Sequence, residues 1–111
     1  DLARAGHLLL NEGEWDGKRL LSEEWVEKAT DTCDIYENYG YLLWLNTDQT
    51  LWPSAPESAY AFLGHGQNVV WVDPEHELVV VLRWLDLADD RDEREDQVNQ
   101  DRFLEKLLAG V

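Results

Sequence analysis

The segment NVVWVDPEHELVVVLRW spans Asn68 to Trp84 and decides the fold. Two runs in it, 68–72 and 78–84, are rich in β-branched and apolar residues and favour strands. The connector 73–77 (DPEHE) joins a proline to acidic turn-forming residues, so the segment predicts an antiparallel hairpin. Because both runs are almost continuously apolar, we expect the hairpin to be buried on both faces.

Upstream of the hairpin, the sequence predicts two more strands. The aromatic stretch YGYLLWLN at 39–46 is apolar enough for a buried strand, and 59–63 favours a shorter one. The stretch between them carries two prolines and several polar residues, so it is predicted to be a loop. The expected strands therefore lie near 39–46, 59–63, 68–73 and 78–85.

Helices are predicted on both sides of these strands along the chain. Asp1 is placed to cap a first helix, and Ser22 to cap a second one with two glutamates in its first turn. Residues 97–108 predict a closing amphipathic helix, whose apolar residues are Val98, Phe103, Leu104, Leu107 and Leu108. The fold class is therefore α+β: an antiparallel sheet with N-terminal helices and a C-terminal helix packed on it.

Composition limits the class of protein. The 111 residues suffice for one domain, and a hydrophobic fraction of 44% with six tryptophans indicates a globular chain. The 24 acidic and 9 basic residues give a net charge of −15, and no basic patch is present to bind nucleic acid. No apolar run has the roughly 18 residues of a membrane span. The single cysteine, Cys33, excludes an intrachain disulfide.

The excess of acidic residues also indicates the salt concentration at which the protein works. Repulsion among so many carboxylates is largely unscreened at about 0.1 M salt, where the Debye length is about 10 Å, but is screened at molar salt. We therefore expect a halophilic protein from a high-salt cytoplasm. Metal binding is not expected, since His7 and His76 lack further ligands at fixed spacing, and no cofactor motif is present.

Three segments together resemble the C-terminal region of the β-lactamase-related serine hydrolases, which include class C β-lactamases, penicillin-binding-protein-like carboxypeptidases and esterases. They are DLARAG with WDG and LLSEEW at 1–25, YGYLLW at 39–44, and FLGHGQ at 62–67 continuing into the hairpin. The resemblance covers nearly the whole chain, in the family's order. It implies part of a β-lactamase/transpeptidase-like fold, with 1–111 forming a single partial domain.

The resemblance also implies a mechanism and a site. Family members attack a carbonyl with the serine of a Ser-x-x-Lys motif, and a Lys-Thr-Gly or His-x-Gly triad on one strand borders the substrate cleft. The matching residues here are His65, Gly66 and Gln67, which we expect to bind a small-molecule substrate in the complete enzyme. Gly66 and Gln67 are expected to contribute backbone N–H groups to an oxyanion site.

The nucleophile segment is not found in these residues. None of the three serines, Ser22, Ser54 and Ser58, is followed by lysine three positions later. We therefore expect a C-terminal fragment of a serine hydrolase for an ester, amide or β-lactam that has no catalytic residue of its own and is inactive alone. The alternative is a stand-alone, non-catalytic acidic domain that binds a partner chain, and an upstream half or a partner chain is expected to cover the sheet.

Overall fold

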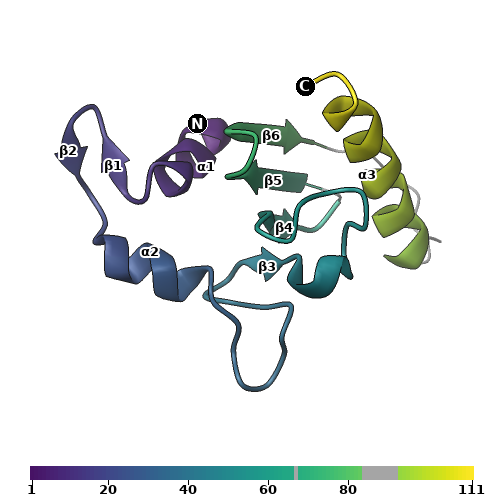
Figure 1. Cartoon of the computed structure of the whole chain (residues 1–111), viewed down its shortest axis with the longest axis horizontal. Coiled ribbons are helices and arrows are strands. Elements are labelled where there is room, and N and C mark those ends of the chain that lie inside the picture. The colour runs from purple at the N-terminus through teal and green to yellow at the C-terminus, as the bar shows by residue number, and fades with distance from the viewer. Residues whose placement is uncertain (67, 84–92) are drawn as a thin grey trace.

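A four-stranded antiparallel sheet lies at the centre of the structure, a computed structural model that describes residues 1–66, 68–83 and 93–111 (Figure 1). The strands are β3 (Trp44–Leu45), β4 (Tyr60–Gly64), β5 (Asn68–Asp73) and β6 (Leu78–Leu82). They are hydrogen-bonded in the order β3-β4-β5-β6, so each strand pairs with the next one along the chain. This arrangement confirms the predicted α+β class with an antiparallel sheet.

The hairpin predicted from the deciding segment is formed by β5 and β6. Val70 pairs with Val81, and Asp73 pairs with Leu78 at the turn. The predicted final strand, 78–85, extends in the described residues to Leu82, and residues 84 and 85 lie outside them. The β5 side chains from Val69 to Asp73 are buried, whereas every β6 side chain is only half-buried. Burial on both faces is therefore confirmed for β5 and is only partial for β6, which is a sheet edge among the described strands.

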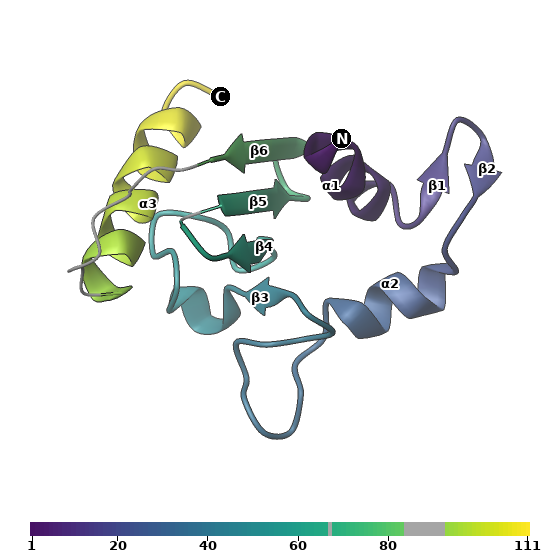
Figure 2. The same ribbon diagram turned by 180° about the vertical axis from the view of Figure 1, so that it is seen from behind.

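The helices lie on opposite faces of this sheet. Figures 1 and 2 show α1 (Leu2–Leu10) and α2 (Glu23–Ala29) on one side and α3 (Glu93–Leu108) on the other. Side chains alternate along the strands, so one core lies on each face. The core under α1 and α2 contains Leu9, Val26, Ala29, Leu43, Leu45, Tyr60 and Val72, and the core under α3 contains Trp52, Ala55, Ala59, Ala61, Val69, Trp71 and Leu104.

The contact between α1 and the sheet depends on Gly6. A Cβ atom at this position would lie 2.6 Å from Cγ1 of Val79 and 3.0 Å from Cγ1 of Val70. The helix backbone therefore packs directly on the valine side chains of β5 and β6. In α1, Leu2 and Ala5 are exposed while Gly6 and Leu9 are buried.

Both predicted caps precede a helix, but only one makes a side-chain cap bond. The Oγ atom of Ser22 accepts a hydrogen bond from the backbone N–H of Trp25 at 3.1 Å, as predicted for α2. Asp1 makes no such bond, and its carboxylate instead lies 3.3 Å from the Arg4 guanidinium. Between α1 and α2, the strands β1 (Glu14–Trp15) and β2 (Lys18–Arg19) form a small hairpin with Asp16 and Gly17 at its turn.

The strand predicted at 39–46 is shorter than expected, because only Trp44–Leu45 forms β3. Just before β3, backbone N–H groups form hydrogen bonds with nearby residues. The N–H of Tyr39 donates to the carbonyl of Tyr36, and the N–H of Gly40 donates to the carbonyl of Leu43. Leu42 has a φ of 60°, which is incompatible with a strand. Tyr39 forms an isolated antiparallel bridge with Trp44, so the residues before β3 fold back on it instead of extending it.

Helix α3 begins at Glu93, earlier than the predicted 97, and its inward face also differs from the prediction. Leu104 is buried, but Val98 and Phe103 are 50% and 42% exposed. Leu108 also packs on the core under α3, and glutamines share the inward face: Gln97 Nε2 donates to the carbonyl of Leu51 at 2.8 Å, and Trp52 Nε1 donates to Gln100 Oε1 at 3.2 Å. Both apolar packing and hydrogen bonds to the loop therefore hold α3 on the sheet.

Candidate functional site

The candidate site lies at the turn between β4 and β5. Gly64 and Asn68 form the last paired positions of the two strands, so three residues connect them. Two of these, His65 and Gly66, are residues predicted to bind substrate, and His65 is exposed. The third predicted residue, Gln67, lies outside the described residues.

The backbone of this turn favours glycine. Gly66 has a φ of 76°, a left-handed conformation that side chains with a Cβ adopt only with strain. No hydrogen bond within the described residues occupies the Gly66 N–H. This donor is therefore available to a ligand as far as the described part of the chain is concerned.

Two side chains from the adjoining strands hold the turn. The Asn68 amide Nδ2 donates to the carbonyl of His65 at 2.6 Å. The amide oxygen of Asn68 accepts from Nε of Arg83, just beyond β6, at 3.2 Å. His65, Asn68 and Arg83 thus form a chain of contacts across the end of β4, β5 and β6. Sequence reasoning missed the last two, since nothing in the pattern of alternating residues indicates a bond to a turn carbonyl.

The three serines of the chain either form structural hydrogen bonds or are exposed to solvent. Ser22 caps α2, as described above, and Ser58 is exposed. Ser54 contacts Asp101 on α3 twice: its N–H donates to Oδ1 at 2.9 Å and its Oγ to Oδ2 at 3.0 Å. None of the three therefore contacts a lysine or histidine within the described ranges, and the chain presents no activated serine there.

One tyrosine of the sheet has perturbed acidity. Tyr60 on β4 is only 5% exposed, and its burial raises the pKa of the phenol because the charged form would lose its hydration. It therefore stays protonated at neutral pH. Its side chain belongs to the core under α1 and α2, which indicates a packing role.

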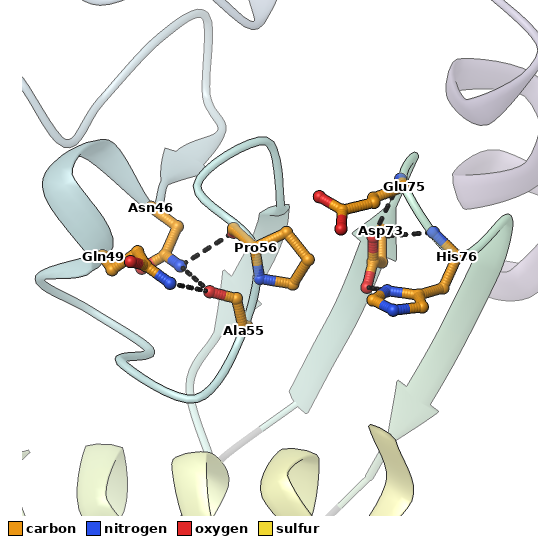
Figure 3. Close-up of polar contacts among 7 residues, drawn as sticks. All are labelled: Asn46, Gln49, Ala55, Pro56, Asp73, Glu75 and His76. Atoms are coloured by element: carbon orange, nitrogen blue, oxygen red, sulfur yellow. Dashed lines mark hydrogen bonds and ion pairs between the residues drawn. The ribbon is translucent and has the colours of Figure 1, made fainter. Parts of the chain in front are cut away.

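Figure 3 shows two polar clusters that sequence reasoning did not identify. In one, the fully buried Asn46 donates from Nδ2 to the carbonyls of Trp52, Ala55 and Pro56 at 2.9, 3.3 and 3.0 Å. In the other, the buried carboxylate of Asp73 accepts from the backbone and the ring of His76. Both clusters organise loops, and an aspartate before proline was the one available signal for the second.

A cavity of about 490 Å³ lies elsewhere, between the end of α1 and the β1–β2 hairpin. Its charged lining includes Glu12, Glu14 and Arg19, whose guanidinium already bonds to the carbonyls of Glu12 and Leu21. These side chains are exposed, so the cavity is a solvated surface depression. Over the described residues, no three His, Cys, Asp or Glu side chains are grouped to hold a metal ion. Within those same limits, no helix has the length and apolar character needed to cross a membrane.

Comparisons with known proteins bear on the fold. No protein-family model matches the sequence, and no curated protein does. Among solved structures, 26 chains match, including the one described as "Putative 6-aminohexanoate-dimer hydrolase from Bacillus anthracis". It superposes with a TM-score of 0.68 at 22% identity, over 100% of this chain and 29% of its own. The chain thus spans under a third of the matched structure, and this likeness shows that it has a portion of the β-lactamase-like fold.

Proposed function

We propose that this chain is the C-terminal portion of a serine hydrolase related to β-lactamases and penicillin-binding proteins, acting on an ester, amide or β-lactam. The observation that carries the proposal is the β4–β5 turn, where an exposed His65 and a left-handed Gly66 lie at the end of a strand in a β-lactamase-like fold. The similar Bacillus anthracis structure is described as a 6-aminohexanoate-dimer hydrolase, which supports hydrolysis as the reaction class.

In this proposal the β4–β5 turn binds the substrate, and a different segment supplies the nucleophile and its base. A serine from a Ser-x-x-Lys segment outside these residues attacks the substrate carbonyl, and a neighbouring base takes its proton. The N–H groups of Gly66 and Gln67 donate to the developing oxyanion, and the His65 side chain donates a hydrogen bond to the bound substrate. The leaving group departs with that proton as the acyl-serine forms, and water then hydrolyses the acyl-serine to release the acid and the free serine.

The isolated chain is therefore expected to be inactive. Assays with a chromogenic ester and a chromogenic β-lactam should give rates at buffer background. A turnover that persists through repurification and is abolished by a serine-directed acylating reagent would contradict the assignment of this chain as a fragment without a nucleophile.

The decisive experiment uses the longer polypeptide encoded by the reading frame that contains this chain. It should include a Ser-x-x-Lys motif, react with a fluorophosphonate probe and hydrolyse one of the two substrates. His65→Ala should lower kcat/KM by roughly ten- to a hundredfold, the value of one hydrogen bond at the reacting centre. His7→Ala, which changes a distant exposed histidine, is the matched control and should leave kcat/KM unchanged.

A second candidate function, binding of a partner chain, is favoured by exposed apolar surface. Ile35 is 96% exposed and Leu42 is 78% exposed, and the half-buried β6 has one unpaired edge among the described strands. In this alternative the reading frame contains no Ser-x-x-Lys motif and the protein does not react with fluorophosphonate. Ile35→Asp and Leu42→Asp would then abolish a complex detected by sedimentation without lowering the melting temperature.

A further inference from the structure

We propose that Asn68 is a positioning residue that fixes the direction of the Gly66 N–H, and that Arg83 in turn fixes Asn68. This inference rests on the proposed function, because it assigns a cause to the geometry of the oxyanion donor. It concerns two residues that contact neither the nucleophile nor the substrate in the mechanism above.

The carbonyl of His65 and the N–H of Gly66 belong to the same peptide unit. No cis peptide bond occurs in the described part of the chain, so the carbonyl of His65 and the N–H of Gly66 lie in one plane and point in opposite directions. A group that anchors the carbonyl therefore also fixes the N–H. The Asn68 amide is such a group, since its Nδ2 lies 2.6 Å from the His65 oxygen.

The same hydrogen bond strengthens the donor. Accepting a proton at a carbonyl polarises the peptide unit and makes its N–H a better donor. At the same time the left-handed Gly66 has wide conformational freedom, so its peptide plane needs an external restraint. The bond from Asn68 supplies that restraint from the first residue of β5, which the sheet holds rigidly by its pairing with Gly64.

Arg83 determines which way the Asn68 amide faces. An asparagine side chain can present either its oxygen or its nitrogen, and the wrong orientation would place two oxygens against each other. Nε of Arg83 can only donate, and it lies 3.2 Å from the Asn68 oxygen. The nitrogen of the amide is thereby directed to the His65 carbonyl. Within the described residues Arg83 forms no ion pair with another side chain. Its side-chain hydrogen bond goes to this neutral amide.

The first test measures kinetics in the longer active polypeptide. Asn68→Ala should lower kcat roughly tenfold, less than the loss of a whole oxyanion donor, with KM within about twofold of wild type. Asn68→Asp keeps an oxygen that accepts from Arg83 but loses the N–H group that donates to His65. Its kcat should therefore fall at least as far as that of Asn68→Ala. Asn99→Asp makes the same chemical change at an exposed position of α3 and should have no effect.

The dependence on Arg83 is tested by a double-mutant cycle. Arg83→Leu should lower kcat in the wild-type background and add nothing in the Asn68→Ala background, because Arg83 acts through Asn68. A wild-type-like kcat in Asn68→Ala, or additive losses in the cycle, would overturn the proposal.

A second readout separates this inference from the proposed function. In the 111-residue chain, the amide resonance of Gly66 should shift on Asn68→Ala and stay in place on Asn99→Asp. An unshifted resonance overturns the positioning role whatever the kinetics. A longer wild-type polypeptide with no hydrolase activity overturns the proposed function, while a Gly66 shift would still establish the hydrogen bond as the restraint on that peptide.

Discussion

The Oδ2 atom of Asp73 lies 2.7 Å from Nδ1 of His76, and together they close the turn of the β5–β6 hairpin (Figure 3). The carboxylate is fully buried, and its other oxygen accepts from the backbone N–H groups of Glu75 and His76 at 2.9 and 3.1 Å. Three donors therefore replace the water that the carboxylate loses on burial. The sequence predicts this turn, but it indicates only a solvated histidine at its tip.

Replacing Asp73 should cost substantial stability. Asp73→Ala leaves two turn N–H groups and the His76 ring without their acceptor, so the free energy of unfolding should fall by about 2–4 kcal/mol. Asp73→Asn keeps an acceptor oxygen and should cost less. Urea unfolding followed by tryptophan fluorescence measures both. Asp34→Ala, at an exposed position, is the control, and equal losses in Asp34→Ala and Asp73→Ala would contradict the role of this buried carboxylate.

A comparable buried group holds the loop before β4. Asn46 donates to three backbone carbonyls and accepts from the N–H of Trp52 at 2.8 Å. Asn46→Asp replaces the donor by a carboxylate that faces those carbonyls, so we expect a loss of about 3 kcal/mol or more and poor folding. Asn99→Asp adds the same charge on the surface of α3 and should change the urea midpoint little. Matching midpoints for the two variants would rule out the loop-organising role.

These clusters mark where prediction from the sequence ends. The β5–β6 hairpin is predictable because its pairing and turn follow from neighbouring residues, and the match at 68–73 is complete. The bonds of Asn46 reach residues 6 to 10 positions away inside an irregular loop, and no period indicates such partners. The inward face of α3 was predictable in part: Leu104 and Leu108 pack on the core, but the bonds of Gln97 and Gln100 to distant loop groups leave no signal in the sequence.

The candidate site was predictable only in part. The resemblance indicated His65 and Gly66, and the turn that joins β4 to β5 does contain them. It did not indicate Asn68 or Arg83, which reach the turn from two other strand ends. Contacts of this kind depend on strand register, which the sequence specifies only after the sheet order is known.

The packing of α1 on the sheet leads to a third prediction. Gly6→Ala would gain up to about 1 kcal/mol of helix propensity, yet its methyl group would overlap Val79. We expect a net loss of about 1–3 kcal/mol from overpacking. Val79→Ala should cost less in the Gly6→Ala background than in wild type, because it makes room for the new methyl group. Gly110→Ala, where a Cβ would meet only ordinary contacts, is the control, and strict additivity of the two substitutions would contradict direct contact.

Salt should stabilise the chain. With 24 acidic and 9 basic residues, charge repulsion opposes folding at low ionic strength, and screening removes it as the Debye length falls from about 10 Å at 0.1 M to about 3 Å at 1 M. The melting temperature, followed by tryptophan fluorescence, should rise steadily from low to molar KCl. We propose on this basis a high-salt cytoplasm as the working environment. A flat or falling melting temperature over that range would exclude it.

Alkaline pH should destabilise the fold through Tyr60. Burial raises its pKa above the ordinary value near 10, so below pH 10 the phenol is neutral in both the folded and unfolded states. Above pH 10 the unfolded state releases the proton while the folded state keeps it, and the free energy of unfolding falls by up to about 1.4 kcal/mol per pH unit from this group. Other groups also titrate there, so the measurement is the difference between wild type and Tyr60→Phe in urea midpoints from pH 8 to 11.5. Tyr60→Phe should lose stability less steeply above pH 10, whereas Tyr41→Phe, at a position 53% exposed, should follow wild type. Parallel curves for wild type and Tyr60→Phe would mean that the Tyr60 phenol ionises in the folded chain as readily as in the unfolded one.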